Sequence, residues 1–263
     1  MGSLPIIHED DALIAVAKPA GIATANVPAG EESVFRLVTR MLAMRSGAGR
    51  GGEPFLGVVS RLDRPVSGVV VFAKTPAAAA HLARQFRDRS VQKTYVAIVE
   101  GRFPAPLDTW VEWVDGFERP RHGASRVVPS AGDAAAVEAR LRARVLVRMG
   151  EVSLVDLRPA TGRRHQLRAQ LASRTCPIVG DRLYGARVPF SEGIALHARS
   201  LSIEHPGGIC RLTLTADVPA AWRSRFAALL NHIPPPEEVD FRDAPRSPLR
   251  GRPPDARADG RQS

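Results

Sequence analysis

A short stretch of the sequence, Ser60 to Gly68, holds one carboxylate between two arginines. Asp63 is flanked by Arg61 and Arg64, and the stretch leads directly into an apolar run at 69–73. An aspartate is ionised at neutral pH without help, so the arginines would offset the cost of partly burying the charge and fix its direction. Such a carboxylate could act as a nucleophile or a general base. Taken alone, Arg-x-Asp-Arg could equally be a structural ion pair that ends a loop.

Four further segments accompany this one along the chain. Together with the Asp63 segment, they resemble the signature blocks of the RluA-like family of RNA pseudouridine synthases, in the form without an N-terminal S4 domain. Several blocks in the correct order, across roughly residues 6 to 215, are difficult to obtain by chance. The further blocks are Gln92 to Gly101, Thr161 to Arg168, Pro177 to Gly185, and Leu196-His197-Ala198 with His205-Pro206.

The resemblance implies a fold class and an activity. The fold is α+β, with a mixed and mostly antiparallel sheet, flanking helices and a central catalytic cleft. The activity is the isomerisation of specific uridines in structured RNA, either tRNA or rRNA, to pseudouridine. The glycosidic bond to N1 breaks, the uracil turns, and a bond forms through C5. Because this reaction changes no oxidation state, we expect no cofactor, and we expect no metal.

The resemblance also assigns residues. Asp63 takes the position of the catalytic carboxylate, Arg168 resembles its basic partner, and Tyr95 resembles the tyrosine that lies against the ring. We expect Arg61 to hold the loop or a phosphate. Arg64 is a candidate for the arginine that fills the gap left by an extruded base, because the target uridine must be flipped out of the RNA structure.

Some residues depart from the family pattern. Ser60 stands where the family usually has His, Val66 and Arg164 where it usually has Thr, and Gln170 where His is common. The changes at Ser60 and Val66, close to Asp63, leave open a non-catalytic RNA-binding or chaperone protein on the same fold.

A hydrolase that uses Asp63 with His165 is disfavoured, because the sequence offers no convincing Ser or Cys nucleophile. We expect His165 to be a helix-start residue satisfied by hydrogen bonds. For Asp181 we expect a turn or scaffold role, and for His197 a packed, hydrogen-bonded one.

The charge is concentrated in one part of the chain. The formal net charge is +10, and residues 234–263 contain six arginines and six acidic residues, so all of it belongs to residues 1–233. A basic folded region suits nucleic acid through phosphate neutralisation. We therefore expect a catalytic domain at 1–233, followed by a Pro/Arg-rich, disordered tail at 234–263.

The cysteines and the lengths of the apolar runs indicate the cellular compartment. Cys176 and Cys210 have neither metal-ligand spacing nor a multi-cysteine framework, which favours a reduced, cytoplasmic setting. No run approaches about 18 apolar residues, so we expect no signal peptide and no membrane span. We expect a monomer.

The sequence has only three lysines, Lys18, Lys74 and Lys93, each beside a motif. These could be sites that need a compact ammonium group.

Local patterns predict the elements that position the site. In 161–171, Leu167 and Leu171 would share one helix face while Arg164 and Arg168 share another, so that Arg168 could point at the Asp63 loop. The segment 103–136 predicts long loops or irregular hairpins, either a substrate-gripping insertion or an ordinary solvated loop. The other predicted elements are strands at 6–7, 12–16, 69–74 and 92–100, an antiparallel hairpin over 141–157, and helices at 32–45, 75–89 and 222–230.

Overall fold

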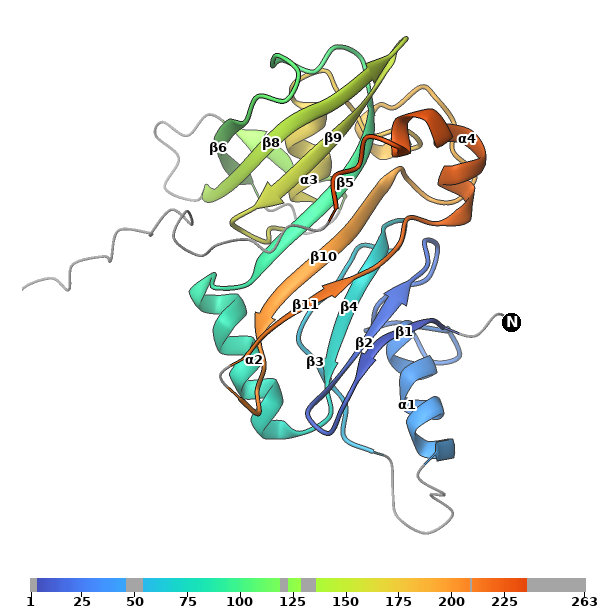
Figure 1. Cartoon of the computed structure of the whole chain (residues 1–263), viewed down its shortest axis with the longest axis vertical. Coiled ribbons are helices and arrows are strands. Elements are labelled where there is room, and N and C mark those ends of the chain that lie inside the picture. The colour runs from blue at the N-terminus through green and yellow to red at the C-terminus, as the bar shows by residue number, and fades with distance from the viewer. Residues whose placement is uncertain (1–3, 46–53, 119–122, 129–135, 209, 236–263) are drawn as a thin grey trace, which may run out of the picture.

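The computed structural model describes residues 4–45, 54–118, 123–128, 136–208 and 210–235. Within these residues, eleven strands form one sheet, and four α-helices and one 3₁₀ turn lie against it (Figure 1). The strand order is β1-β2-β4-β10-β5-β9-β8-β6-β7, with β11 paired to β10 and β3 paired to β4.

The strands are β1 (Ile6–Glu9), β2 (Leu13–Lys18), β3 (Gly57–Val58), β4 (Ser67–Ala73), β5 (Gln92–Glu100), β6 (Val111–Glu118), β7 (Arg126–Val128), β8 (Val137–Met149), β9 (Val152–Pro159), β10 (Leu196–Glu204) and β11 (Arg211–Thr215). The helices are α1 (Val34–Arg45), α2 (Pro76–Asp88), α3 (Gln166–Ala172) and α4 (Ala220–Leu230), with the 3₁₀ turn η1 (Arg182–Tyr184).

The sheet is mixed but almost entirely antiparallel. Among the pairings between named strands in the described residues, only that of β10 with β4 is parallel, through His197 opposite Ser67 and Ala198 opposite Gly68. Gly68 has a φ of +125°, and a Cβ there would lie 2.2 Å from the carbonyl oxygen of Ala198, so no other residue fits this crossing. The expected α+β class with a mostly antiparallel sheet is confirmed.

The apolar side chains form cores on both sides of this crossing. The largest core joins β5, β8 and β9 to α3 and α4, through Ile98, Leu141, Leu171 and Trp222. Two smaller cores lie on β2 and β4, one containing Leu82 of α2 and the other Val38 of α1. The sheet therefore has two packed halves, and the loop before β4 lies where they meet.

Most of the predicted elements are present. The strands at β1, β2, β4 and β5, the β8–β9 hairpin, and helices α1, α2 and α4 all lie where the patterns placed them. Thr75 caps α2 by accepting a hydrogen bond from the Ala78 amide at 3.1 Å, and Pro76 is the first helical residue. The expected tail at 234–263 lies outside the described residues from 236 onward.

Two predictions need correction. Residue His165 has a φ of +55°, which a right-handed helix cannot contain, so α3 begins at Gln166 and not near 161. Arg164 therefore lies before the helix and does not share a face of it with Arg168. In the segment 103–136, residues 111–118 form a regular strand of the main sheet with Phe117 buried. Its register against β8 is a long-range feature that a local pattern cannot reveal.

His197 is a packed, hydrogen-bonded residue, as expected. Its Nε2 lies 3.1 Å from the carbonyl oxygen of Ala216, which can only accept, so Nε2 carries the proton and Nδ1 accepts from the Ser67 hydroxyl at 2.9 Å. The ring is 1% exposed and packs edge-on against Trp222. Burial lowers the pKa of His197 to about 4.

This burial predicts a loss of stability in mild acid. As pH falls from 6.5 toward 4, His197 becomes protonated in the unfolded chain but stays neutral in the folded protein. The free energy of unfolding should therefore fall by up to about 3 kcal/mol over this pH range. Urea unfolding between pH 7 and 4 measures this slope. His197→Gln should flatten it, whereas His232→Gln, at an exposed histidine, should leave it unchanged. An unchanged slope in His197→Gln would contradict the assignment.

Candidate active site

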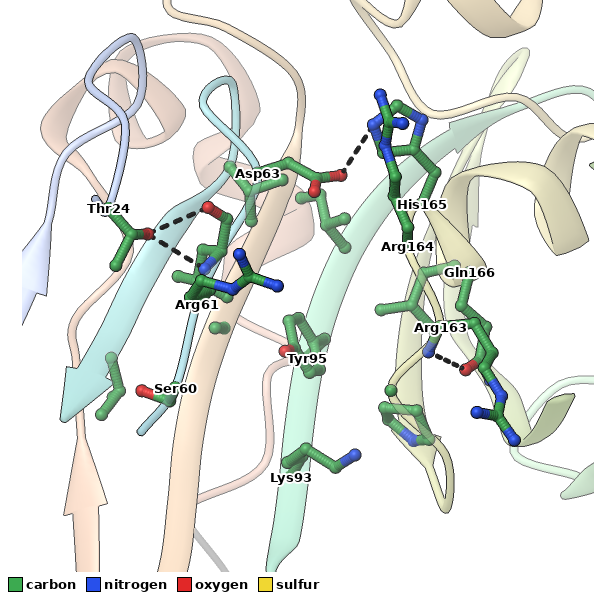
Figure 2. A pocket seen from close by; sticks show the side chains of 18 of the residues that line it. Thr24, Ser60, Arg61, Asp63, Lys93, Tyr95, Arg163, Arg164, His165 and Gln166 are labelled. Atoms are coloured by element: carbon green, nitrogen blue, oxygen red, sulfur yellow. Dashed lines mark hydrogen bonds and ion pairs between the residues drawn. The ribbon is translucent and has the colours of Figure 1, made fainter. Parts of the chain in front are cut away.

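A pocket of about 520 Å³ opens between two segments that carry the signature residues. One wall is the loop 59–64 with residues 23–25, and the other is the segment 161–168 (Figure 2). The floor comes from β5 and β10, through Lys93, Tyr95, Ala198 and Ser200. All five predicted site residues line this pocket. Three of them, Arg61, Asp63 and Tyr95, are labelled in Figure 2.

The Asp63 loop is held from one side by a threonine. Thr24 donates its hydroxyl to the Leu62 carbonyl at 3.0 Å and accepts from the Leu62 amide at 3.1 Å, so it pairs with the residue before Asp63 as a neighbouring strand would (Figure 2). The Val66 amide donates to the Asp63 carbonyl at 3.0 Å, closing a turn. These bonds fix the backbone on both sides of the carboxylate.

A buried lysine holds the same loop from behind. The Lys18 Nζ donates to the carbonyl oxygens of Pro19, Arg64 and Val66 at 2.9, 3.2 and 2.7 Å, and the residue is only 1% exposed. Three acceptors converging on one nitrogen suit an ammonium group better than a planar guanidinium. Burial lowers the pKa of Lys18 to about 7, and the negative charge of Asp63 opposes that shift.

Arg168 joins the Asp63 carboxylate to a second acid. Its Nη1 donates to Asp63 Oδ2 at 3.2 Å, while Nε and Nη2 donate to the two oxygens of Asp181 at 2.7 and 2.8 Å. Asp181 is 1% exposed, Arg168 5% and the Asp63 side chain 29%. Asp181 thus orients the guanidinium by a bidentate pair, and the carboxylate of Asp63 keeps one face toward the pocket. The predicted contact of Arg168 with the Asp63 loop is confirmed.

His165 reaches Asp63 from the other wall. The His165 Nε2 lies 3.7 Å from Asp63 Oδ2, and Figure 2 shows the two side chains facing each other. His165 is indeed the residue at the start of α3, as expected, but its ring also points into the pocket. The pattern Arg-Arg-His-Gln could not reveal this, because the direction of the ring depends on the positive φ of His165.

Two groups of the floor extend from β5. Tyr95 is placed with its ring in the pocket, and burial, together with the charge of Asp63, raises its pKa, so the phenol stays protonated. Lys93 donates to the Thr161 carbonyl at 2.9 Å and ties β5 to the segment before α3. Burial lowers the pKa of Lys93 to about 8.

The two arginines beside Asp63 have different surroundings. Arg64 forms an ion pair with Glu31, and both side chains are partly exposed. Arg61 is exposed and lines the pocket, and among the described residues it makes no ion pair or hydrogen bond (Figure 2). Arg61 is therefore a cation that an incoming phosphate could reach without breaking an existing contact, as is the exposed Arg164 on the opposite wall.

The departures from the family pattern keep local hydrogen bonding satisfied. The Ser60 hydroxyl accepts from the Val71 amide at 2.8 Å and donates to its carbonyl at 3.3 Å. Val66 is 2% exposed within the largest core. Gln170 donates to Asp115 at 2.6 Å and accepts from Gln166 at 3.1 Å. Each of these three side chains is therefore accommodated by hydrogen bonding or packing in this fold.

The segment 103–136, a candidate for gripping the substrate, contributes no described residue to the pocket lining. It reaches the site indirectly, because the Tyr184 hydroxyl donates to the Ser125 carbonyl at 3.2 Å and contacts His165 Nδ1 at 3.1 Å. The basic residues Arg119, Arg121 and His122 of this segment lie outside the described residues.

One group away from the pocket could place three ligand atoms together. His8, Asp10 and His205 bring Nε2, a carboxylate oxygen and Nε2 within 4.8 Å of one another. However, His205 Nδ1 accepts from the Gly207 amide at 3.0 Å, so its proton lies on Nε2 and is donated to Asp10. A metal-bound histidine needs the opposite tautomer. The group is a hydrogen-bonded link between β1 and the β10–β11 turn.

Comparison with known proteins gives the class. Residues 12–173 match the family model for RNA pseudouridylate synthase. The chain is 35% identical over 208 residues to the dual-specificity RNA pseudouridine synthase RluA of Escherichia coli, covering 77% of this chain and 88% of that protein. The human RNA pseudouridylate synthase domain containing 4 has a TM-score of 0.69 at 26% identity, covering 86% of this chain and 93% of that one. The chain belongs to the RNA pseudouridine synthase family.

Other relatives are longer. The ribosomal large subunit pseudouridine synthase C of Vibrio cholerae is 32% identical over 222 residues, and this match covers 82% of the chain but 66% of that protein. For the ribosomal large subunit pseudouridine synthase D of Borreliella burgdorferi, 60% of the protein is covered. These relatives confirm the resemblance to the RluA-like family. In the described part of the chain, no helix is long and apolar enough to cross a membrane.

Removing the ammonium group of Lys18 should loosen the Asp63 loop. Lys18→Met takes away a donor shared by three carbonyls, and we expect the free energy of unfolding to fall by about 1–3 kcal/mol and turnover to fall with it. Lys74→Met is the matched control, because Lys74 also donates to a carbonyl, but that carbonyl belongs to Asp10 in the β1–β2 turn and not to the Asp63 loop. Turnover that falls equally in both variants would contradict a specific role for Lys18.

Removing the charge of Asp181 should release Arg168. In Asp181→Asn the buried guanidinium loses its bidentate partner, so we expect the free energy of unfolding to fall by about 3 kcal/mol and turnover to fall as Arg168 shifts toward Asp63. Urea unfolding and single-turnover rates measure the two effects. Asp11→Asn, at an exposed aspartate, is the control. Wild-type turnover in Asp181→Asn would show that Arg168 needs no such anchor.

Proposed function

We propose that this protein isomerises specific uridines in structured RNA, tRNA or rRNA, to pseudouridine, with Asp63 as the catalytic carboxylate. The observation that carries the proposal is the Asp63 carboxylate held 3.2 Å from the buried Arg168 at the edge of a pocket, in a chain of this family. The names of the relatives, all RNA pseudouridine synthases, support this activity.

The geometry supports the chemistry in a specific way. Asp63 is oriented by Arg168, yet 29% of its side chain remains exposed toward the pocket, where it can attack the ribose or act on the uracil. Tyr95 lies on the floor of the pocket with its hydroxyl protonated, and a uracil can stack against its flat ring. No electron is gained or lost by the substrate, so these side chains can carry the reaction without a redox group.

RNA recognition follows from the charge. The net charge of +10 and the exposed Arg61 beside the pocket suit contact with phosphates. Extruding a uridine from a stem costs a few kcal/mol of stacking and pairing. In this proposal Arg61 holds a phosphate and not the loop, because its side chain makes no hydrogen bond or ion pair within the described residues. Arg64 occupies the gap left by the base, after exchanging its pair with Glu31 for the RNA.

The class of RNA stays open between two alternatives. Relatives of similar identity carry names that specify large-subunit rRNA, tRNA or dual specificity. We further infer that residues 1–233 are the catalytic domain, since the described elements end at Leu230. We also propose that the protein acts as a monomer in the cytoplasm, the compartment that its two free cysteines favour.

Asp63→Asn should abolish turnover and spare RNA binding. The change removes the charge at nearly constant shape, so we expect a fall of more than about 10²-fold in the single-turnover rate with an unchanged Kd. Pseudouridine mapping of total RNA, from cells that lack the gene and are complemented with wild type, Asp63→Asn or the control Asp11→Asn, identifies the site. A uridine modified with wild type and Asp11→Asn but not with Asp63→Asn is the expected result.

Two outcomes would contradict the proposal. Full activity in Asp63→Asn would remove Asp63 from its role. RNA that binds the protein tightly but shows no gene-dependent pseudouridine would favour the alternative function, a non-catalytic RNA-binding or chaperone protein on this fold.

A further inference from the structure

The position of the proton on His165 follows from its neighbours. The Ser125 carbonyl oxygen can only accept, so the Tyr184 hydroxyl spends its single proton there, at 3.2 Å. The hydroxyl oxygen then accepts from His165 Nδ1 at 3.1 Å. A neutral imidazole protonated on Nδ1 carries a lone pair on Nε2. The chain of hydrogen bonds therefore leaves Nε2 as an acceptor that points into the pocket.

That lone pair faces another acceptor. The His165 Nε2 lies 3.7 Å from Asp63 Oδ2, and the side chains are 11% and 29% exposed. Two acceptors at this distance repel unless a proton lies between them or a donor enters. Burial lowers the pKa of His165, the charge of Asp63 opposes the shift, and the charges of Arg168 and Arg164 reinforce it. The imidazole is thus an unprotonated base at neutral pH.

The backbone holds the ring in this position at a cost. His165 has a φ of +55° and a ψ of +20°, a left-handed conformation that a non-glycine residue adopts at an expense of order 1 kcal/mol. Its side chain makes no capping hydrogen bond to α3. The conformation therefore does not serve the helix, and its effect is to direct the imidazole toward Tyr184 and Asp63.

The proposed reaction needs a base in addition to the group that acts at the glycosidic bond. When C5 has bonded to C1′, it still carries its hydrogen, and the ring has a double bond between N1 and C6. Loss of the C5 proton restores the C5–C6 double bond, and N1 takes up one proton. The pocket's other basic or phenolic side chains are arginines, Lys93 and the protonated Tyr95. Besides Asp63, only His165 among the described lining residues is an unprotonated base.

We propose that His165 is a second catalytic residue of this site, whose Nε2 accepts the proton from C5 and returns it to N1 or to water. The inference rests on the proposed function and deepens it by dividing the chemistry between two groups. Asp63 acts where the bond to N1 breaks, and His165 acts after the new carbon bond has formed. One proton leaves C5 and one is gained at N1, so the step is balanced without a co-reactant.

The test compares three substrates that differ only at C5. Unmodified tRNA and large-subunit rRNA transcripts are made with uridine, with 5-deuterouridine or with 5-fluorouridine, and single-turnover consumption is followed with the full-length protein. 5-Fluorouridine has no proton at C5, so its rearrangement needs no base there. In His165→Gln, turnover of uridine should fall about 10²-fold, 5-deuterium should slow it further than in wild type, and 5-fluorouridine should be consumed at the wild-type rate.

A second variant and a control keep the result interpretable. Tyr184→Phe keeps the ring that lies 5.0 Å from the Arg168 guanidinium but removes the acceptor for Nδ1. It should show the same substrate pattern with a smaller fall. His232→Gln, at an exposed histidine, should match wild type on all three substrates. Thermal unfolding of each variant reports whether it is folded.

The outcomes separate the two proposals. An equal fall on all three substrates would mean that His165 only positions Asp63, and no fall would remove it from the mechanism. Either result overturns the inference while leaving the proposed function intact. Wild-type protein that converts none of the transcripts, with Asp63→Asn behaving identically, would contradict the proposed function itself.

Discussion

The site depends on one buried guanidinium, that of Arg168. A charge that is 5% exposed must be paired, and Arg168 is paired twice, to the buried Asp181 by two hydrogen bonds and to the half-open Asp63 by one. The two acids are bound unequally. The bidentate pair with Asp181 uses Nε and Nη2 of the guanidinium, so only Nη1 is left to donate to Asp63. Asp63 is therefore oriented without being buried, and its second oxygen stays available for chemistry.

The rest of the fold brings Asp63 and Arg168 together. Asp63 precedes β4 and Arg168 lies on α3, 105 residues later in the chain. They meet because β4 and β10 pair in parallel at Gly68 and because the Asp63 loop is tied from behind by Lys18. All three lysines of the chain donate to a main-chain carbonyl, those of Val66, Asp10 and Thr161 among them. At Lys18, three carbonyl oxygens converge on one nitrogen, a geometry that suits a compact ammonium group.

The sequence predicted the parts of this site that depend on local pattern or on family resemblance. Asp63 and Arg168 could be placed together because helical spacing aims Arg168 away from Leu167 and Leu171, which are buried as expected. The direction of His165 could not be predicted, since its left-handed backbone interrupts a segment whose residues all read as helical. The strand at 111–118 could not be predicted for a different reason. Its pairing with β8 is non-local, and the Pro- and Gly-rich flanks masked it.

The departures from the family pattern divide into those that pack and one that faces the RNA. Ser60 forms hydrogen bonds with the backbone of Val71, and Val66 packs in the core. Gln170 forms side-chain hydrogen bonds with Gln166 and Asp115. Arg164 is different, because it is exposed, lines the pocket and adds a positive charge where the family usually has a neutral threonine. That charge also disfavours protonation of the adjacent His165. A single replacement thus increases the attraction of the pocket mouth for phosphate and helps to keep its imidazole unprotonated, which links substrate binding to acid–base chemistry.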